Sequence, residues 1–192
     1  MKKIIVVIFL LNSISLFSQE NNHSNEITFL LGKLRINLQT NFLQSGTLAD
    51  FTEQHNYYAS NTFSLGLELA YGNQEKINYG VGMYNQFSSS FEQIKGDISI
   101  LPVYAFIDYP LIEREQLPIQ LSIRFGYAII STENGIKSIS DGLYHAFGFT
   151  AIMTKKIQMK IMYGNNYGKI GIENKEYSIR NGNFSLSLYF TI

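Results

Sequence analysis

Four charged residues fall on the polar faces of segments that otherwise alternate between apolar and polar side chains. They are Arg35, Glu68, Arg124 and Lys160, and Lys33 shares the face of Arg35. Because side chains alternate between the two faces of a strand, these residues point away from the apolar faces of their segments. Inside a small closed sheet they would form a buried polar network that holds the strands in register. A gated narrow pore, which opens when an ion pair breaks, is the functional alternative.

Two histidines are candidates for catalysis or metal binding. His55 lies near Glu53 in a polar segment, but a single histidine cannot build a zinc site. His145 shares a face with Leu143 and Phe147, and no His-x-Ser pair surrounds it. A Ser/His/acid set of the kind used by lipid-modifying barrels is therefore not indicated. We expect no enzymatic activity, no metal and no cofactor.

Other features of the sequence narrow the function further. Gly80-x-Gly82 lacks the third glycine and the helix of a nucleotide-binding fingerprint, so we expect these glycines to make room for a bulky neighbour inside the sheet. The formal net charge of zero gives no electrostatic argument for nucleic-acid binding. With no cysteine, the chain has neither disulfides nor thiolate metal sites.

The chain begins with the features of a secretory signal peptide. Met1-Lys2-Lys3 is basic, residues 4–11 are apolar, and small polar residues follow. The apolar run is too short to span a bilayer as a helix, which takes roughly 20 residues. We predict cleavage after Ser18, so that residues 1–18 are a signal peptide and residues 19–192 are one β-barrel domain.

Most of the remaining chain alternates with the period of a β-strand. The longest example runs from Ile119 to Ile129 and places six apolar residues on one face. The first strand is the least regular, because its apolar phase changes near Gly32, where a bulge would reset the pleat unless the start lies outside the membrane. Pro102 is expected at a bulge or near a rim, since proline lacks a ladder donor. The eight predicted strands are 27–38, 63–71, 77–84, 98–109, 119–129, 143–153, 157–163 and 184–192.

The connections between these segments alternate between long and short. The long polar ones are 39–60, 88–96, 131–142 and 165–181, and the shorter ones are 72–76, 110–117 and 154–156. Long outer loops and short periplasmic turns are typical of barrels in an outer membrane. Both ends of the barrel domain would then lie on the periplasmic side.

The last segment has one face that is apolar up to the final residue. A soluble antiparallel sheet also alternates, but it normally shows more charge to water than the 16% charged residues of this chain provide. A transmembrane barrel instead needs an apolar face toward lipid and a narrow polar interior. The sequence therefore predicts an all-β fold, a single eight-stranded antiparallel up-and-down transmembrane β-barrel. The predicted lipid face of the closing strand comprises Phe184, Leu186, Leu188, Phe190 and Ile192.

The strand plan resembles the small eight-stranded outer-membrane barrels of the OmpA/OmpX-like group. The resemblance covers residues 25–192 and includes the strand ends Tyr71-Gly72 and Tyr163-Gly164, the strand Ile100 to Tyr104, and the closing pattern Phe184 to Ile192. It implies a location in the outer membrane of a Gram-negative-type cell, contact with outer-membrane lipids and insertion by the barrel-assembly machinery. Members commonly end on phenylalanine, whereas here Phe190 is third from the end.

The most specific function that these observations favour is a structural or surface-interaction role. It would be exerted through the outer connections 39–60 and 165–181, whose ligand the sequence does not identify. The alternatives are a small gated pore, a lipid-modifying outer-membrane enzyme and a soluble periplasmic lipid-binding barrel.

Overall fold

The computed structural model describes residues 32–49, 54–58, 61–72, 77–91, 94–112, 117–132, 136–172 and 175–192. Contacts divide the chain into two units, Met1–Gly32 and Lys33–Ile192. All of the described strands belong to the second unit. The predicted signal peptide and residues 27–31 of the first predicted strand lie outside the described residues.

The described strands belong to one antiparallel sheet. Their bounds are β1 (Lys33–Ala49), β2 (Gln54–Tyr58), β3 (Thr62–Gly72), β4 (Asn78–Phe91), β5 (Ile94–Ile112), β6 (Ile119–Thr132), β7 (Ile136–Ser140), β8 (Gly142–Ile152), β9 (Ile157–Ile172) and β10 (Lys175–Thr191).

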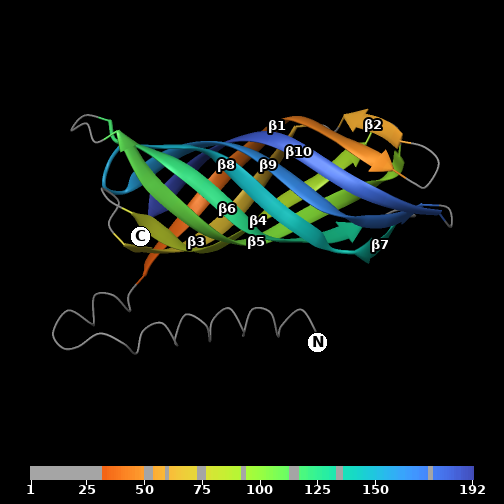
Figure 1. Cartoon of the computed structure of the whole chain (residues 1–192), viewed down its shortest axis with the longest axis horizontal. Helices are drawn as coiled ribbons and strands as arrows, with labels where there is room; N and C mark the ends of the chain where they lie inside the picture. Colours follow the sequence, from red (N-terminus) through yellow and green to blue (C-terminus); the bar gives the residue numbers. More distant parts are fainter. Residues whose placement is uncertain are drawn as a thin grey trace. The chain divides into compact units, whose positions relative to one another are not determined.

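These strands close a ring of eight, because β2 and β3 share one position beside β1, and β7 and β8 share one position beside β9. β1 pairs with β3 as far as Asn41 and with β2 from Ser45 onward. β9 pairs with β8 along one part of its length and with β7 along another. The ring is closed by β1 and β10, which pair from Arg35↔Thr191 to Ala49↔Ser178. The predicted eight-stranded antiparallel barrel is confirmed (Figure 1).

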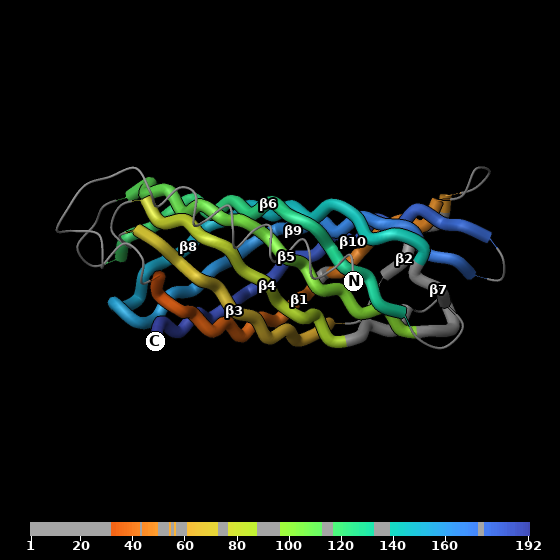
Figure 2. Tube along the Cα trace, turned by 90° about the horizontal axis from the view of Figure 1, so that it is seen from below, coloured from red at the N-terminus to blue at the C-terminus, as the bar shows by residue number. Residues whose placement is uncertain are grey.

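The strands are staggered around the ring. A path of paired residues that starts at Arg35 returns to β1 at Gly46, further along the same strand. Strands with such a stagger must tilt against the barrel axis, as the diagonal course of the tube in Figure 2 shows. The path runs through Glu68, Gly82, Tyr104, Gly126, Tyr144, Asn166 and Asn181.

The prediction that residues 39–60 and 165–181 are loops is wrong. β1 continues to Ala49 and β2 follows it, while β9 runs to Ile172 and β10 starts at Lys175. Parts of the predicted loops 88–96 and 131–142 are also strand, in β4, β5 and β7. The sheet therefore extends well beyond the predicted strands at one end, where β2 and β7 lie in both Figure 1 and Figure 2.

The apolar residues of the extended part change face, which explains the error. In β10, Leu186 and Leu188 point outward, whereas Ile179 is buried inside the ring. β9 shows the same change between Ile161, which is exposed outside, and Ile170, which is buried inside. In the sequence this change of phase looks like a loss of alternation, although the backbone ladder continues without interruption.

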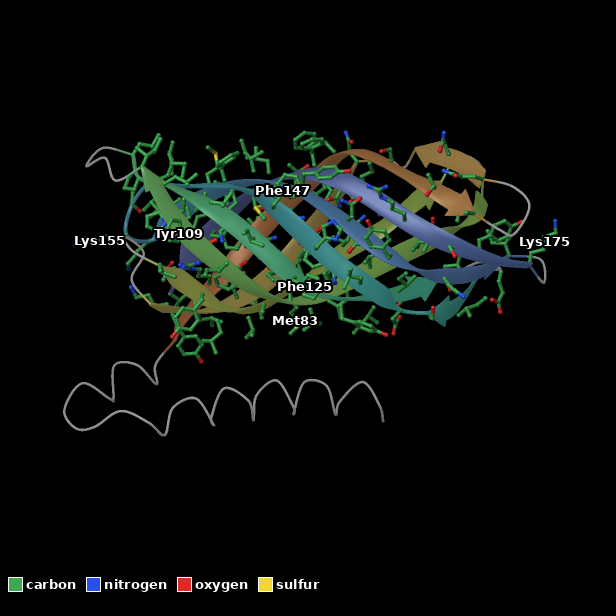
Figure 3. All side chains as sticks on the ribbon, in the orientation of Figure 1. Met83, Tyr109, Phe125, Phe147, Lys155 and Lys175 are labelled. Atoms are coloured by element: carbon green, nitrogen blue, oxygen red, sulfur yellow. The ribbon has the colours of Figure 1, made fainter. Side chains whose placement is uncertain are left out.

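The short connection at 154–156 is a turn, as predicted. Thr154 Oγ1 accepts hydrogen bonds from the backbone N–H groups of Lys156 (3.1 Å) and Ile157 (3.0 Å). β3 ends at Gly72, whose φ of 94° lies in the left-handed region that favours glycine. Figure 3 places Lys155 of the turn and Lys175 of β10 at opposite ends of the barrel.

The prediction that Pro102 lies at a bulge or near a rim is wrong. Pro102 lies inside β5, opposite Ala128, and the register with β6 is regular there. The register shift between Gln86 and Ser89 of β4 lies opposite other residues of β5. A strand residue directs its N–H to only one of its two neighbours, so a proline removes a single ladder bond and the flanking pairs keep the strand in place.

The outward faces form a continuous apolar belt to which every strand of the ring contributes. Leu38 on β1 is 54% exposed and Phe125 on β6 is 61% exposed. Exposure of an apolar surface of this extent to water is unfavourable, whereas lipid tails can cover it. All five residues of the predicted lipid face, from Phe184 in β10 to Ile192 just beyond its end, lie on this face, and Figure 3 labels Met83, Tyr109, Phe125 and Phe147. Across the described residues, no helix has the length and hydropathy needed to cross a membrane.

Arginine on this belt should destabilise the barrel. We expect Leu186→Arg to lower the free energy of unfolding in lipid vesicles by about 2–4 kcal/mol, because the charge would enter the hydrocarbon layer. Ser178→Arg, on the same face of β10 but beyond the belt, should change it by less than about 0.5 kcal/mol. Urea titration read by heat-dependent gel migration measures both. Equal costs at the two positions would contradict the assignment of the faces.

Candidate functional site

The lumen contains a cluster of five charged side chains, which we call the lumen charge cluster. Its members come from β1, β3, β5, β6 and β9, and their side chains are at most 1% exposed. They are Arg35, Glu68, Asp108, Arg124 and Lys160. The structure thus brings together all four residues that the sequence singled out, and it adds Asp108. Lys33, which shares the face of Arg35, is exposed at the start of β1.

Asp108 was missed because its segment is apolar on both faces. Tyr104 and Phe106 precede it at the same parity and are buried in the lumen, so the face of Asp108 was readable from its spacing to these aromatic residues. An acidic residue within an otherwise apolar strand was the available signal.

Glu68 lies between three cations. Its Oε1 is 3.3 Å from Nη2 of Arg124, and its Oε2 is 3.6 Å from Nη1 of Arg35 and 3.7 Å from Nζ of Lys160. The hydroxyl group of Tyr104 donates a further hydrogen bond to Oε1 at 3.1 Å. A buried carboxylate needs this number of partners to offset its loss of hydration.

Asp108 is bound even more closely. Lys160 Nζ donates to both of its oxygens, at 3.1 and 3.0 Å, and Arg35 lies 3.5 Å from Oδ2. Ser122 and Asn78 donate from the neighbouring strands at 2.7 and 3.2 Å. The two carboxylates therefore join residues from most of the ring into one network.

The cluster contains three cations but only two carboxylates, and aromatic rings surround the excess positive charge. The guanidinium carbon of Arg124 lies 4.8 Å from the centroid of the Tyr104 ring. Lys160 Nζ lies 4.7 Å from the ring of Tyr189 and 5.1 Å from that of Phe106. The Tyr189 hydroxyl group also accepts a hydrogen bond from Arg124. Ring faces are negative, so they stabilise a cation without adding a third carboxylate.

Glycines make the space for this cluster, as predicted for Gly80-x-Gly82. A Cβ atom at Gly82 would lie 2.7 Å from Cγ of Glu68 and 2.9 Å from Cζ of Tyr104. A Cβ atom at Gly80 would lie 3.0 Å from the ring of Phe106. Real Cβ atoms essentially never come within 3.0 Å of another heavy atom, so Gly82 allows Glu68 and Tyr104 to lie against the wall, while a Cβ atom at Gly80 would clash chiefly with the carbonyl oxygen of Leu69.

Further from the turn at 154–156, the lumen becomes first amide-rich and then apolar. Asn41 donates to Ser64 at 2.7 Å, Gln44 donates to Thr62 at 2.8 Å, and Gln86 donates to Gln44 at 3.0 Å. The buried apolar cluster of the lumen continues beyond them, and we call this end of it the outer plug. It comprises Leu48, Ile98, Ile100, Ile130, Ile170 and Ile179.

His145 does not join the lumen charge cluster. His145 lies on the outer wall, as the parity of Leu143 and Phe147 predicts, and stacks on Tyr167 with ring centroids 5.6 Å apart. Its Nε2 atom is 3.5 Å from Nδ2 of Asn165. The backbone of His55 is part of β2, while its side chain lies outside the described residues. In the described part of the chain, no group of three His, Cys, Asp or Glu residues is arranged to hold a metal ion.

No protein-family model matches the chain, and no curated protein sequence matches it either. Solved structures do. The neisserial surface protein A has a TM-score of 0.54 and 15% identity, covering 83% of this chain and 97% of that one. The outer membrane protein AlkL in lipid bilayers has a TM-score of 0.52 and 13% identity, covering 91% and 96%. The chain has the fold of the small outer-membrane barrels.

The fold and the apolar belt together make this chain an outer-membrane β-barrel protein in contact with membrane lipid, as the sequence predicts. In such barrels the short turns are periplasmic and the longer hairpins are extracellular. We therefore expect the turn at 154–156 to lie at the periplasmic end and the extended part of the sheet, with the outer plug, to lie outside, and this orientation stays a prediction. Insertion by the barrel-assembly machinery stays a prediction.

The unequal numbers of cations and carboxylates give a test of the lumen charge cluster. Glu68→Gln would leave three cations against one carboxylate, and we expect it to cost about 3–5 kcal/mol, as for other buried charges that lose their partner. Lys160→Met leaves two charges of each sign and should cost less than half as much. Denaturant unfolding in the same vesicles compares the two. If Lys160→Met costs as much as Glu68→Gln, charge balance does not govern the cluster.

Proposed function

We propose that the protein is a closed outer-membrane barrel with a structural or surface-interaction role, and that it is neither a channel nor an enzyme. The observation that carries this proposal is the filled lumen. Side chains of an eight-stranded barrel can occupy its whole interior. Here charged, aromatic, amide and apolar layers follow one another along the axis.

Three tyrosines add to the closure next to the lumen charge cluster. The rings of Tyr84, Tyr104 and Tyr144 have centroid separations of 5.5 to 6.1 Å, so each touches the other two. All three side chains are buried. A water path would have to displace these rings as well as break the ion pairs, and the outer plug would still lie beyond them. This arrangement supports a static plug over a gate.

The surroundings of His145 support a non-enzymatic role. A hydrolytic set needs a histidine between a nucleophilic hydroxyl group and an orienting carboxylate. His145 instead contacts the amide of Asn165 and the ring of Tyr167. An amide and a stacked phenol ring hold the imidazole in place but do not activate a nucleophile.

The extended part of the sheet is the surface available for interaction outside the cell. Its outward face includes the exposed polar side chains of Asn56 on β2, Lys169 on β9 and Glu176 on β10. Because these side chains stand on paired strands, they form a rigid surface. We therefore assign the interaction role to this strand-built surface in place of the loops 39–60 and 165–181 that the sequence indicated.

Conductance separates the closed barrel from the gated pore. We expect no single-channel steps from the wild-type protein, Glu68→Ala or Arg124→Ala in planar bilayers, because the tyrosines and the outer plug stay in place in all three. A general porin in the same membranes provides the positive control, and heat-dependent gel migration verifies that each variant is folded. Discrete steps from the wild type, or from a folded variant, would establish the pore in its place.

Site-specific cross-linking tests the surface role. A photoreactive residue in place of Glu176 on intact cells should capture a partner that is not lipid, because this side chain stands beyond the belt. The same residue in place of Leu188, within the belt, should capture lipid only. If positions throughout the extended part capture nothing but lipid or lipopolysaccharide, the interaction role is wrong and a purely structural one remains.

A further inference from the structure

An aromatic row crosses the outer wall where the apolar belt ends. Phe42, Phe184, Tyr163 and Phe147 are paired neighbours on β1, β10, β9 and β8. Their ring centroids are 6.3, 4.9 and 5.7 Å apart in that order. Aromatic girdles of this kind mark the membrane–water interface of barrels. The outer-leaflet headgroups therefore lie next to this row, on the side of the extended sheet.

The outer wall becomes polar directly beyond this row. The next outward positions on the same four strands are Ser45, Gly182, Asn165 and His145, which are again paired neighbours. They border a pocket of about 320 Å³, within the range of small-ligand sites. The residues that line it are Ser45, Gly46, Thr47, Asn56, Tyr163, Asn165, Arg180 and Gly182.

Arg180 is held at this pocket by its neighbours. Its Nε donates to Oδ1 of Asn165 at 3.1 Å, and its guanidinium carbon lies 5.9 Å from the centroid of the Tyr167 ring. Asn165 is only 2% exposed although it stands on the outward face, and Tyr167 stacks on His145. A buried amide and a stacked aromatic pair thus fix the direction of the cation, which lowers the entropic cost of binding an anion.

The chemistry of the lining fits a phosphate group. A guanidinium matches the geometry of phosphate oxygens, and it carries five N–H donors, so that Nε can stay bonded to Asn165. Hydroxyl groups of Ser45, Thr47 and Tyr163 and the amide of Asn56 add donors, and none of the lining residues is acidic. Gly182 leaves the floor of the pocket open, since a Cβ atom there would lie 3.1 Å from Asn165 Oδ1 and 3.2 Å from the Tyr163 hydroxyl group.

We infer that this pocket binds the phosphate group of an outer-leaflet glycolipid, with Arg180 as the principal contact and the aromatic row against the acyl chains. The cation lies beyond the aromatic row, in the same order along the membrane normal as the phosphate group and the acyl chains of such a lipid. A free anion would not require the aromatic row. The inference does not rest on the proposed surface role, because it is argued from the pocket beside the aromatic row, although Asn56 borders both.

Native mass spectrometry of the full barrel in detergent micelles tests this inference. The probes are a diphosphorylated glycolipid of the lipid A type, the same glycolipid without its phosphates, and inorganic phosphate. We expect the phosphorylated lipid to bind at least about tenfold more tightly than the dephosphorylated one. Arg180→Gln should remove that difference, and Gly182→Leu should reduce it by filling the pocket. Lys175→Gln, which removes an exposed cation at the end of β10, should change binding by less than about twofold.

Three results would overturn the inference. Equal effects of Arg180→Gln and Lys175→Gln would mean that general surface charge is responsible. Equal binding of the two glycolipids would reduce the site to ordinary aromatic contacts with acyl chains. Displacement of the lipid by millimolar inorganic phosphate would indicate a site for a free anion. Heat-dependent gel migration verifies that Arg180→Gln and Gly182→Leu retain the barrel, so that lost binding is not lost folding.

Discussion

Closure of the ring between β1 and β10 is the constraint on which the rest of the structure depends. In hydrocarbon no water can bond to an open edge, so each strand of a membrane-spanning sheet needs two neighbours. β1 and β10 supply each other with the missing partner from Arg35↔Thr191 to Ala49↔Ser178, and the amide of Ile192 donates to the carbonyl oxygen of Leu34 at 2.9 Å. A closed ring of eight leaves a narrow interior, and this is why the inward residues must be chosen to fill it.

The distribution of apolar and polar side chains between the inside and the outside of the barrel reverses along its length. Within the belt, apolar side chains point outward and the interior is polar, and it contains the lumen charge cluster. In the extended part, the outer plug fills the interior, and exposed polar side chains such as Lys169 and Glu176 point outward. Single strands contain both distributions. The apolar residues of β9 change from the outer face at Ile161 to the inner face at Ile170, and those of β10 change from the outer face at Leu186 to the inner face at Ile179.

This change of face also explains what the sequence could predict. Within the belt, alternation identified the strands, the faces and the four charged residues, because every second residue has a single environment there. Beyond it, Ile170 and Ile179 follow the opposite phase, and a method that looks for one continuous phase finds only polar, glycine-bearing loops. Asp108 was missed for a related reason, since large aromatic residues fill the lumen beside it and hide the polar parity of β5. The pocket at Arg180 was beyond reach, because its residues come from β1, β2, β9 and β10 and meet only through the register.

The two distributions together decide where a small barrel of this kind can recognise anything. Its interior is occupied by side chains whose removal leaves unpaired charges or voids, so little freedom remains there for a ligand. The side chains of the outer wall do not have to fill the lumen, but within the belt they offer only apolar contacts. Polar side chains on rigid strands first become available where the apolar residues change face, just beyond the row from Phe42 to Phe147. Arg180, Asn165 and Tyr163 stand at that level, where a lipid presents both its charged group and its acyl chains. Recognition of membrane lipid therefore follows from the position at which the apolar residues change from the outer to the inner face of the barrel.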